Sequence, residues 1–177
     1  RARGASRAPR ACSPGAGSDC FRLGAPVNTK STKLLQDLGA YVLADSHQPV
    51  CVKKAAEMIR AERGYRWVGV YKVTRGECVI IAGTGEEPPT YARFPVTQGL
   101  CGAVVESRET LVVPDVKKDP RYLPTFWNTE SESVVPIMDE NKKRVGGILD
   151  AESDKLDDFT EDDRDCREHA AGLLAGA

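Results

Sequence analysis

The sequence of 177 residues predicts an α+β domain, in which helices pack on one face of an antiparallel β-sheet and loops cover the other. Three observations lead to this prediction. Apolar residues recur at helical spacing near both ends of the ordered part of the chain. Strand-like segments occupy its middle, and short turns join some of them in pairs. At this length the chain buries one ordinary core and not two.

Two helices are expected at the start of the ordered part. Residues 31–45 place apolar side chains at helical spacing, and Ser31 is a plausible N-cap. Residues 50–63 repeat this pattern. Gly64 then ends the second helix, because glycine readily takes the left-handed conformation found at helix C-termini.

A β-hairpin is expected next. Residues 66–73 alternate, with Trp67 and Tyr71 on the same face. Both faces of this segment are apolar at its centre, which predicts a central strand covered on both sides. Residues 76–85 form a second strand that follows a tight turn at residues 74–76, so the two strands should pair in antiparallel fashion.

The remainder is expected to hold two helices and three strands. Residues 99–109 have helical spacing, and residues 110–116 form a short strand that a proline halts. Residues 131–153 form two strands joined by a polar turn. Residues 159–177 form the last helix, with Thr160 as N-cap and acids in its first turn, where the helix dipole favours negative charge.

Residues 1–28 differ in composition from everything after them. Five arginines stand against one acid, and Gly, Ala, Ser and Pro dominate. Such a segment buries too little apolar surface to offset the entropy of ordering, so we expect a disordered tail. An inert tail is favoured over an organelle transit peptide, because no apolar helix punctuated by arginine is evident. The single folded domain is expected to span residues 29–177.

Composition and charge are typical of a soluble globular protein. Hydrophobic residues make up 41% of the chain and charged residues 29%, and the net charge is −1. This balance gives no global attraction to nucleic acid or to an anionic membrane. No apolar run is long enough to span a membrane. We therefore expect a cytoplasmic protein whose partners include neither nucleic acid nor a membrane.

The six cysteines are scattered along the chain, at Cys12, Cys20, Cys51, Cys78, Cys101 and Cys166. They form no CxxC pair, and only two histidines accompany them, so the usual spacing of a zinc site is absent. We expect reduced thiols rather than a disulfide framework. We also expect no metal site and no cofactor.

Four motifs occur in a fixed order along the chain: WVGVY, FPVTQGLCGAVVESRETLVVPDVKKDPRYL, SESVVPIMDENKKRVGGILDAES and FTEDDRD. Together they resemble a GAF domain, and the resemblance covers the chain from about Thr32 to its end. It implies a small-molecule pocket between the sheet and its covering loops. It also implies a sensory or regulatory role, with a homodimer or a protein signalling partner as the expected assembly.

The same motifs are also similar to those of the free methionine-(R)-sulfoxide reductases, an enzymatic branch of this family. The resemblance implies that Trp67 and Tyr71 form the aromatic wall of the pocket. It further implies that Glu132, Asp150 and Glu152 hold the amino group of a ligand. Three carboxylates and two aromatic rings suit a small polar or cationic metabolite.

The redox chemistry of that branch is only partly retained. Sulfoxide reduction needs an attacking thiolate and a second thiol that resolves the oxidised form as a disulfide. The resemblance matches Cys101 to the middle one of three cysteines, but it places Tyr91 and Thr125 where the other two belong. We therefore expect a non-enzymatic domain, in which Cys101 is catalytic only if the chain is a divergent reductase.

Alternatives to this interpretation stay open. In a divergent reductase, Cys78 or Cys51 would supply a missing thiol. In a purely structural subunit, the pocket would be collapsed and would bind no ligand. The aromatic residues would then be ordinary core, the carboxylates ordinary surface groups, and Cys101 a buried small hydrophobe.

Overall fold

The structure is a computed structural model that describes residues 28–44, 49–139, 141 and 143–175. The elements in this described part are α1 (Thr29–Ala44), α2 (Pro49–Arg63), β1 (Trp67–Val73), β2 (Glu77–Gly83), β3 (Arg93–Pro95), α3 (Gly99–Ser107), β4 (Leu111–Val113), the 3-10 turn η1 (Val116–Lys118), β5 (Ser131–Met138), β6 (Val145–Ser153) and α4 (Glu161–Leu174). Most of the predicted tail, residues 1–27, lies outside the described residues, as do the last two residues of the predicted C-terminal helix.

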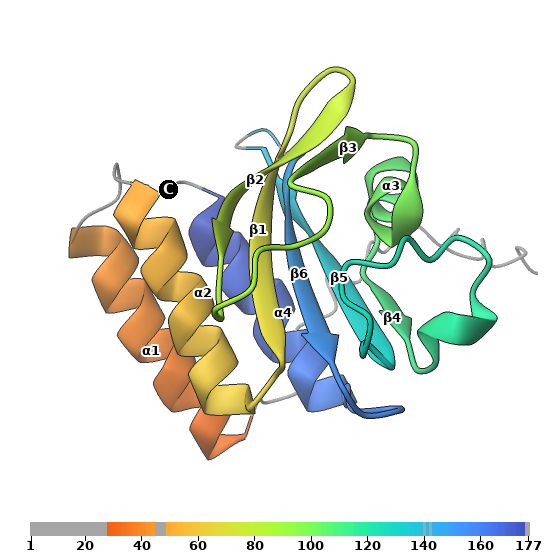
Figure 1. The fold of residues 1–177 in the computed structure, drawn as a ribbon. Coiled ribbons are helices and arrows are strands. Elements are labelled where there is room, and N and C mark those ends of the chain that lie inside the picture. Colours follow the sequence, from red (N-terminus) through yellow and green to blue (C-terminus); the bar gives the residue numbers. More distant parts are fainter. Residues whose placement is uncertain (1–27, 45–48, 140, 142, 176–177) are drawn as a thin grey trace, which may run out of the picture.

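The six strands form one antiparallel sheet in the order β3-β2-β1-β6-β5-β4 (Figure 1). The predicted hairpin of β1 and β2 is confirmed, and the Thr74 amide donates a hydrogen bond to the Glu77 carbonyl across the turn at 2.9 Å. Strands β5 and β6 pair along most of their length, as predicted. The α+β class is therefore confirmed.

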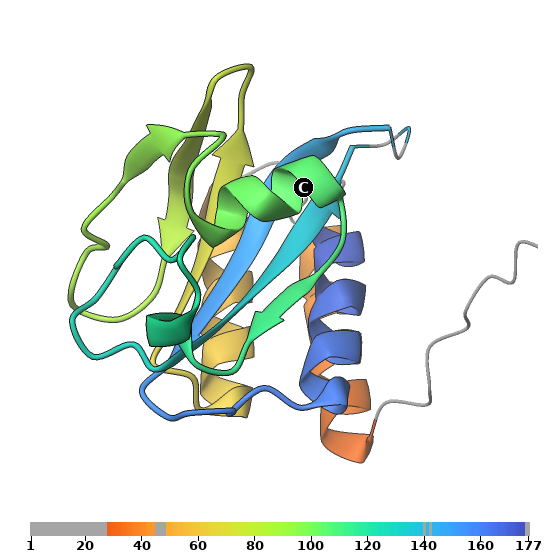
Figure 2. The ribbon, with the colours of Figure 1, turned by 90° about the vertical axis from the view of Figure 1, so that its right-hand side faces the viewer.

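Three helices cover one face of the sheet, and the fourth lies on the other face. Helices α1, α2 and α4 lie together on the first face, while α3 crosses the opposite face beside the loops (Figures 1 and 2). The prediction that helices occupy one face is thus right for three of them and needs correction for α3. The physical reason is that the central strands are apolar on both faces, so the loop face also needs an apolar cover.

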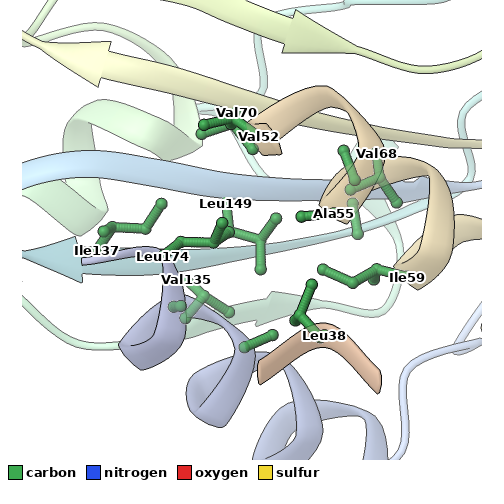
Figure 3. Packing of buried hydrophobic residues seen from close by; sticks show 14 of the residues in the cluster. Leu38, Val52, Ala55, Ile59, Val68, Val70, Val135, Ile137, Leu149 and Leu174 are labelled. Atoms are coloured by element: carbon green, nitrogen blue, oxygen red, sulfur yellow. The ribbon is translucent and has the colours of Figure 1, made fainter. Parts of the chain in front are cut away.

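The core on the helix face consists mainly of aliphatic side chains from three helices and the central strands. Leu38 of α1 and Ile59 of α2 pack with Val68 and Leu149 of the sheet (Figure 3). All four side chains are at most 1% exposed. This apolar layer packs against one face of the sheet, and the candidate site lies on the opposite face.

The helix ends agree with the predicted signals at Gly64 and at Thr160, the N-cap of α4, and differ at the start of α1. Gly64 follows α2 with a φ of 72°, as predicted. Helix α1, however, is capped by Asn28, whose Oδ1 accepts a hydrogen bond from the Ser31 amide at 3.0 Å, so Ser31 is not the cap. The Asn28 side chain also donates to Asp162 at 2.7 Å. The ordered fold therefore includes Asn28, the last residue of the predicted tail. Asp162, which is distant in sequence, holds this capping residue by a hydrogen bond.

Two short elements were not predicted. Strand β3 and the turn η1 have three residues each, which is too short for any periodic pattern to show. Strand β3 extends the sheet by pairing Phe94 with Cys78 of β2. Within the described residues, no helix combines the length and hydropathy needed to cross a membrane.

Candidate functional site

The strand register gathers the five predicted site residues on the face that α3 and the loops cover. Glu152 of β6 pairs with Trp67 of β1 on one side and with Glu132 of β5 on the other. Directly paired residues point to the same face of a sheet, and so do residues separated by an even number of positions in one strand. Tyr71 is four positions after Trp67 and Asp150 is two before Glu152, so both lie on this same face. All five side chains are buried, with at most 4% of their surface exposed.

A small, partly enclosed cavity lies between this face and its cover. Its volume is about 20 Å³, which holds one water molecule or one ion. The lining residues that matter here are Tyr71, Glu132 and Asp150 of the sheet, Cys101 of α3, and Tyr91 and Thr125 of the covering loops. Three of the five predicted site residues therefore line the cavity.

Trp67 lies on the same face but does not line this cavity. Its ring packs between Tyr71 and Phe126, with ring centroids 6.2 Å and 5.5 Å away. It lies over Gly69, where an added Cβ would be only 1.9 Å from the ring. In the described part of the chain, its indole nitrogen has no hydrogen-bond partner. Trp67 thus acts as core packing beside the cavity, with one polar atom unsatisfied.

Glu152 also lies outside the cavity lining. The Thr129 hydroxyl donates a hydrogen bond to its Oε2, and Oε1 has no such partner among the residues described. Burial raises the pKa of Glu152 to about 6, although the Thr129 hydrogen bond and the charge of Arg66 act to lower it. The carboxyl group therefore titrates close to physiological pH.

Glu132 and Asp150 give the cavity a strongly acidic character. Burial raises the pKa of each well above its usual range, and the neighbouring acids raise both further. No lysine, arginine or histidine is among the residues that line the cavity. The charge of Arg167 acts to lower the pKa of Asp150, but burial and the neighbouring acids dominate, so the surroundings favour the protonated form of both groups unless a cation joins them.

Cys101 is buried in the cavity wall as a protonated thiol. Its side chain is 5% exposed, and Sγ lies 4.0 Å from Asp150 Oδ2. Burial, and then the charge of Asp150, raise the pKa of Cys101 well above its usual value. Because the thiolate is the nucleophilic form, these surroundings suppress nucleophilic reactivity.

The other thiols divide between the two faces of the sheet. Cys78 belongs to the apolar cluster that contains Cys101, and burial raises its pKa to about 11. Cys51 belongs to the cluster on the helix face, so the sheet separates it from the cavity. Neither these three nor Cys166 forms a disulfide, as expected for reduced thiols; the other two cysteines lie outside the described residues.

Two loops meet above the cavity at the positions where the reductase resemblance requires cysteines. Tyr91 follows β2, and Thr125 precedes β5. The backbone amide and the hydroxyl of Thr90 donate hydrogen bonds to the Thr125 carbonyl at 3.2 Å and 2.6 Å. Hydrogen bonds therefore join the two loops beside the cavity, where this chain has tyrosine and threonine in place of cysteines. No sequence pattern indicated this contact.

Sequence reasoning also missed a compact group of potential metal ligands. The ligand atoms of Cys101, Glu132 and Asp150 all lie within 4.8 Å of one another. The prediction of no metal site rested on patterns that are local in sequence, such as CxxC pairs and histidine spacing. Ligands from three separate elements leave no such local signature, although each of the three residues was singled out for another reason.

Comparisons with known proteins agree with this fold. The sequence profile of the GAF domain family matches residues 50–177. GAF domain-containing protein A of Dictyostelium discoideum is 30% identical over 131 residues, which cover 73% of this chain and 80% of that protein. The free methionine-R-sulfoxide reductase of Saccharomyces cerevisiae is 31% identical over 110 residues, which cover 61% of this chain and 60% of the enzyme.

Solved structures show the same relationship. The free methionine-R-sulfoxide reductase of Neisseria meningitidis, in complex with its substrate, superposes with a TM-score of 0.76 and 26% sequence identity. The match covers 86% of this chain and 91% of that enzyme.

Proposed function

This chain belongs to the GAF domain family, and from that membership we propose that it is a non-enzymatic sensory or regulatory module that binds a small cationic ligand. The observation that carries the proposal is the pair of buried carboxyl groups, Glu132 and Asp150, that face a small cavity whose lining contains no basic side chain. A ligand cation would replace the protons that these groups otherwise hold. This chemistry accords with the expected polar or cationic metabolite.

Ligand entry requires the covering loops to separate. A cavity of about 20 Å³ is far smaller than the several hundred Å³ of ordinary metabolite sites. The two hydrogen bonds from Thr90 to Thr125 join the loops at the surface, where each bond contributes about 1 kcal/mol. We expect the loops to open at this contact and to close again over the bound cation.

The absence of sulfur at two positions separates this chain from the chemistry of its enzymatic relatives. The resemblance places Tyr91 and Thr125 where two reductase cysteines belong, and neither side chain can form the disulfide that resolves an oxidised thiol. The remaining thiol, Cys101, is protonated. We propose that the chain has a binding cavity but lacks the thiols that would donate electrons to a sulfoxide.

Ligand binding can be tested by thermal unfolding with free amino acids and simple alkylamines. A cation that binds the folded state raises the melting temperature, with about 2.7 kcal/mol of added stability at a ligand concentration 100 times its Kd. Asp150→Asn should abolish the effect. The exposed acid Asp154 lies on the same segment, and Asp154→Asn should preserve it. If neither these probes nor any metal ion stabilises the wild type, the chain is instead a structural subunit without a ligand.

A divergent reductase is the second candidate, because Cys78 lies in the apolar cluster that contains Cys101. In that case the two thiols would give two electrons to the sulfoxide, forming a disulfide, a thioether and water. The test is incubation with free methionine-(R)-sulfoxide and a dithiol reductant. We expect no methionine. Methionine production that Cys101→Ser abolishes would overturn the non-enzymatic proposal.

We further propose a reducing compartment such as the cytosol, in keeping with the four described thiols that form no disulfide. The signalling surface is proposed to be the layer formed by α1 and α4, which pack on each other behind the sheet. A homodimer or another protein would contact these helices. Light scattering of the purified protein, with and without a bound cation, tests the dimer.

A further inference from the structure

The most compact set of donor atoms in the described structure comes from three different elements. Cys101 extends from α3, Glu132 from β5 and Asp150 from β6, and all three side chains are at most 5% exposed. Their ligand atoms lie within 4.8 Å of one another, and the Sγ of Cys101 is 4.0 Å from Oδ2 of Asp150. One thiol and two carboxyl groups therefore converge on one point of the cavity wall.

These separations are near those that a tetrahedral zinc ion requires. With a Zn–S bond of about 2.3 Å and a Zn–O bond of about 2.1 Å at a tetrahedral angle, the sulfur and oxygen ligands lie about 3.6 Å apart. Cys101 Sγ is 4.0 Å from Asp150 Oδ2, which is slightly longer. The whole group lies within 4.8 Å, so coordination of one ion would draw the three ligand atoms together by roughly 1 Å.

A second observation points independently to a missing cation. Asp150 is 2% exposed and lines the cavity, yet its Oδ1 has no hydrogen-bond partner among the described residues. A buried carboxyl oxygen without a partner carries a desolvation cost of about 1–3 kcal/mol, and more when charged. A ligand that touches this oxygen would remove that cost.

The volume of the cavity selects among cations. About 20 Å³ has room for one water molecule or one small ion, so a metal ion held by these three ligands would itself occupy the space. The same volume excludes a metabolite while the loops are closed. It also leaves too little room for the six or more oxygen ligands and waters that Ca²⁺ and Mg²⁺ require.

We propose that Cys101, Glu132 and Asp150 form a binding site for a zinc-class divalent metal ion. This inference rests on the proposed function and deepens it, since it names the chemical class of the cation in the same cavity. The thiolate is the ligand that favours zinc-class ions over hard ions. The two carboxylates supply the negative charge, and a bound dication neutralises most of it.

The experiment uses the full chain after treatment with a chelator, with Cys12 and Cys20 replaced by alanine so that thiols outside the described residues do not bind metal. Zn²⁺ is titrated by calorimetry, and Co²⁺ is titrated as a spectroscopic probe. We expect one ion per chain, and a thiolate-to-cobalt charge-transfer absorption in the near ultraviolet. Ca²⁺ and Mg²⁺ should not compete with either ion.

Variants locate the site. Cys101→Ala should eliminate the charge-transfer absorption and weaken zinc binding at least about 100-fold, because one of three ligands is lost. Cys78→Ala is the matched control, since Cys78 is a buried thiol of the same apolar cluster and is outside the ligand group. It should leave both readouts unchanged. Circular dichroism checks that each variant is folded.

The outcomes separate the inference from the proposed function. If amines stabilise the protein but zinc does not bind, or if zinc binds equally well to Cys101→Ala, the metal site is refuted and the cationic-ligand function stands. If neither amines nor Zn²⁺ bind to the folded wild type, both proposals fail. Binding that depends on Cys101 and Asp150, but not on Cys78, supports the metal site.

Discussion

At the scale of single residues, the candidate site depends on glycines as much as on acids. Gly69 pairs with Asp150, and its missing side chain leaves space for the Trp67 ring. That ring packs against Tyr71, which in turn lines the cavity. The absence of one methyl group therefore fixes the position of an aromatic side chain, and through it one wall of the cavity.

Gly69→Ala should destabilise the fold by about 1–3 kcal/mol, because the added Cβ would force the Trp67 ring to move. Chemical denaturation measures the loss. Gly76→Ala serves as the control, since nothing lies within 4 Å of a Cβ at that turn position, and it should change stability little. Equal effects of the two substitutions would show that the ring does not determine the cost.

Glu152 should make the ligand-free protein more stable in mild acid than at neutral pH. Its pKa is about 6 in the folded state against a usual value of 4.5, so the folded state binds the proton more tightly. The contribution is fully present below pH 4.5, is lost as pH rises through about 6, and amounts to about 2 kcal/mol.

Thermal unfolding between pH 5 and pH 7 tests this pH dependence. Glu152→Gln should make the stability depend less steeply on pH. Part of the dependence should remain, because the pKa values of Glu132 and Asp150 are raised as well. The acids with lowered pKa values, such as Asp162 and Asp163, lose their protons below this window. A slope unchanged by Glu152→Gln would assign the effect to other groups.

At the scale of elements, the start of α4 connects the helix layer to the sheet. Thr160 and Asp163 form a capping box, in which the Asp163 amide donates to the Thr160 hydroxyl at 3.2 Å and the Thr160 amide donates to the Asp163 carboxylate at 2.9 Å. The Tyr65 hydroxyl also donates to Asp163 at 2.6 Å, and Asp162 accepts from Asn28. The first turn of α4 is thus hydrogen-bonded both to the segment before β1 and to the start of α1.

Thr160→Ala should cost about 1 kcal/mol of stability, because it removes the acceptor for the first turn of α4. Thr160→Ser keeps the hydroxyl and should recover most of the loss. Urea denaturation of both variants measures the difference. A serine variant as unstable as the alanine variant would mean that the threonine methyl group, rather than the cap, stabilises this end.

At the scale of the whole molecule, the sheet separates two apolar layers with different roles. Leu38 belongs to the layer behind the sheet, whereas Cys101 and Tyr71 belong to the layer that surrounds the cavity. The strands between them are hydrogen-bonded into one sheet. Stability and ligand binding can therefore be perturbed separately from the two sides.

Leu38→Ala should lower stability by about 2–5 kcal/mol, because Leu38 is fully buried in the helix-side core. The affinity for the cation at low temperature, measured by calorimetry, should stay the same. Leu43 is 85% exposed, and Leu43→Ala should change neither property. Loss of affinity in folded Leu38→Ala would show that the two layers are coupled through the sheet.

The sequence by itself determined the longer elements and the faces of the strands. Alternation with a period of two put Trp67 and Tyr71 on one face of β1, and the same rule put Asp150 and Glu152 on one face of β6. Family motifs then indicated the GAF fold. Local chemistry predicted the ends at Gly64 and Thr160 correctly.

Only the tertiary structure decided which of these residues meet. It placed Tyr71, Glu132 and Asp150 on the cavity and left Trp67 and Glu152 beside it. It also brought Tyr91 and Thr125 together from separate loops and moved α3 to the loop face. The physical reason is that a strand's period fixes the direction of a side chain, whereas cavity walls depend on register and loop contacts between segments far apart in sequence. Such contacts leave no trace in local patterns.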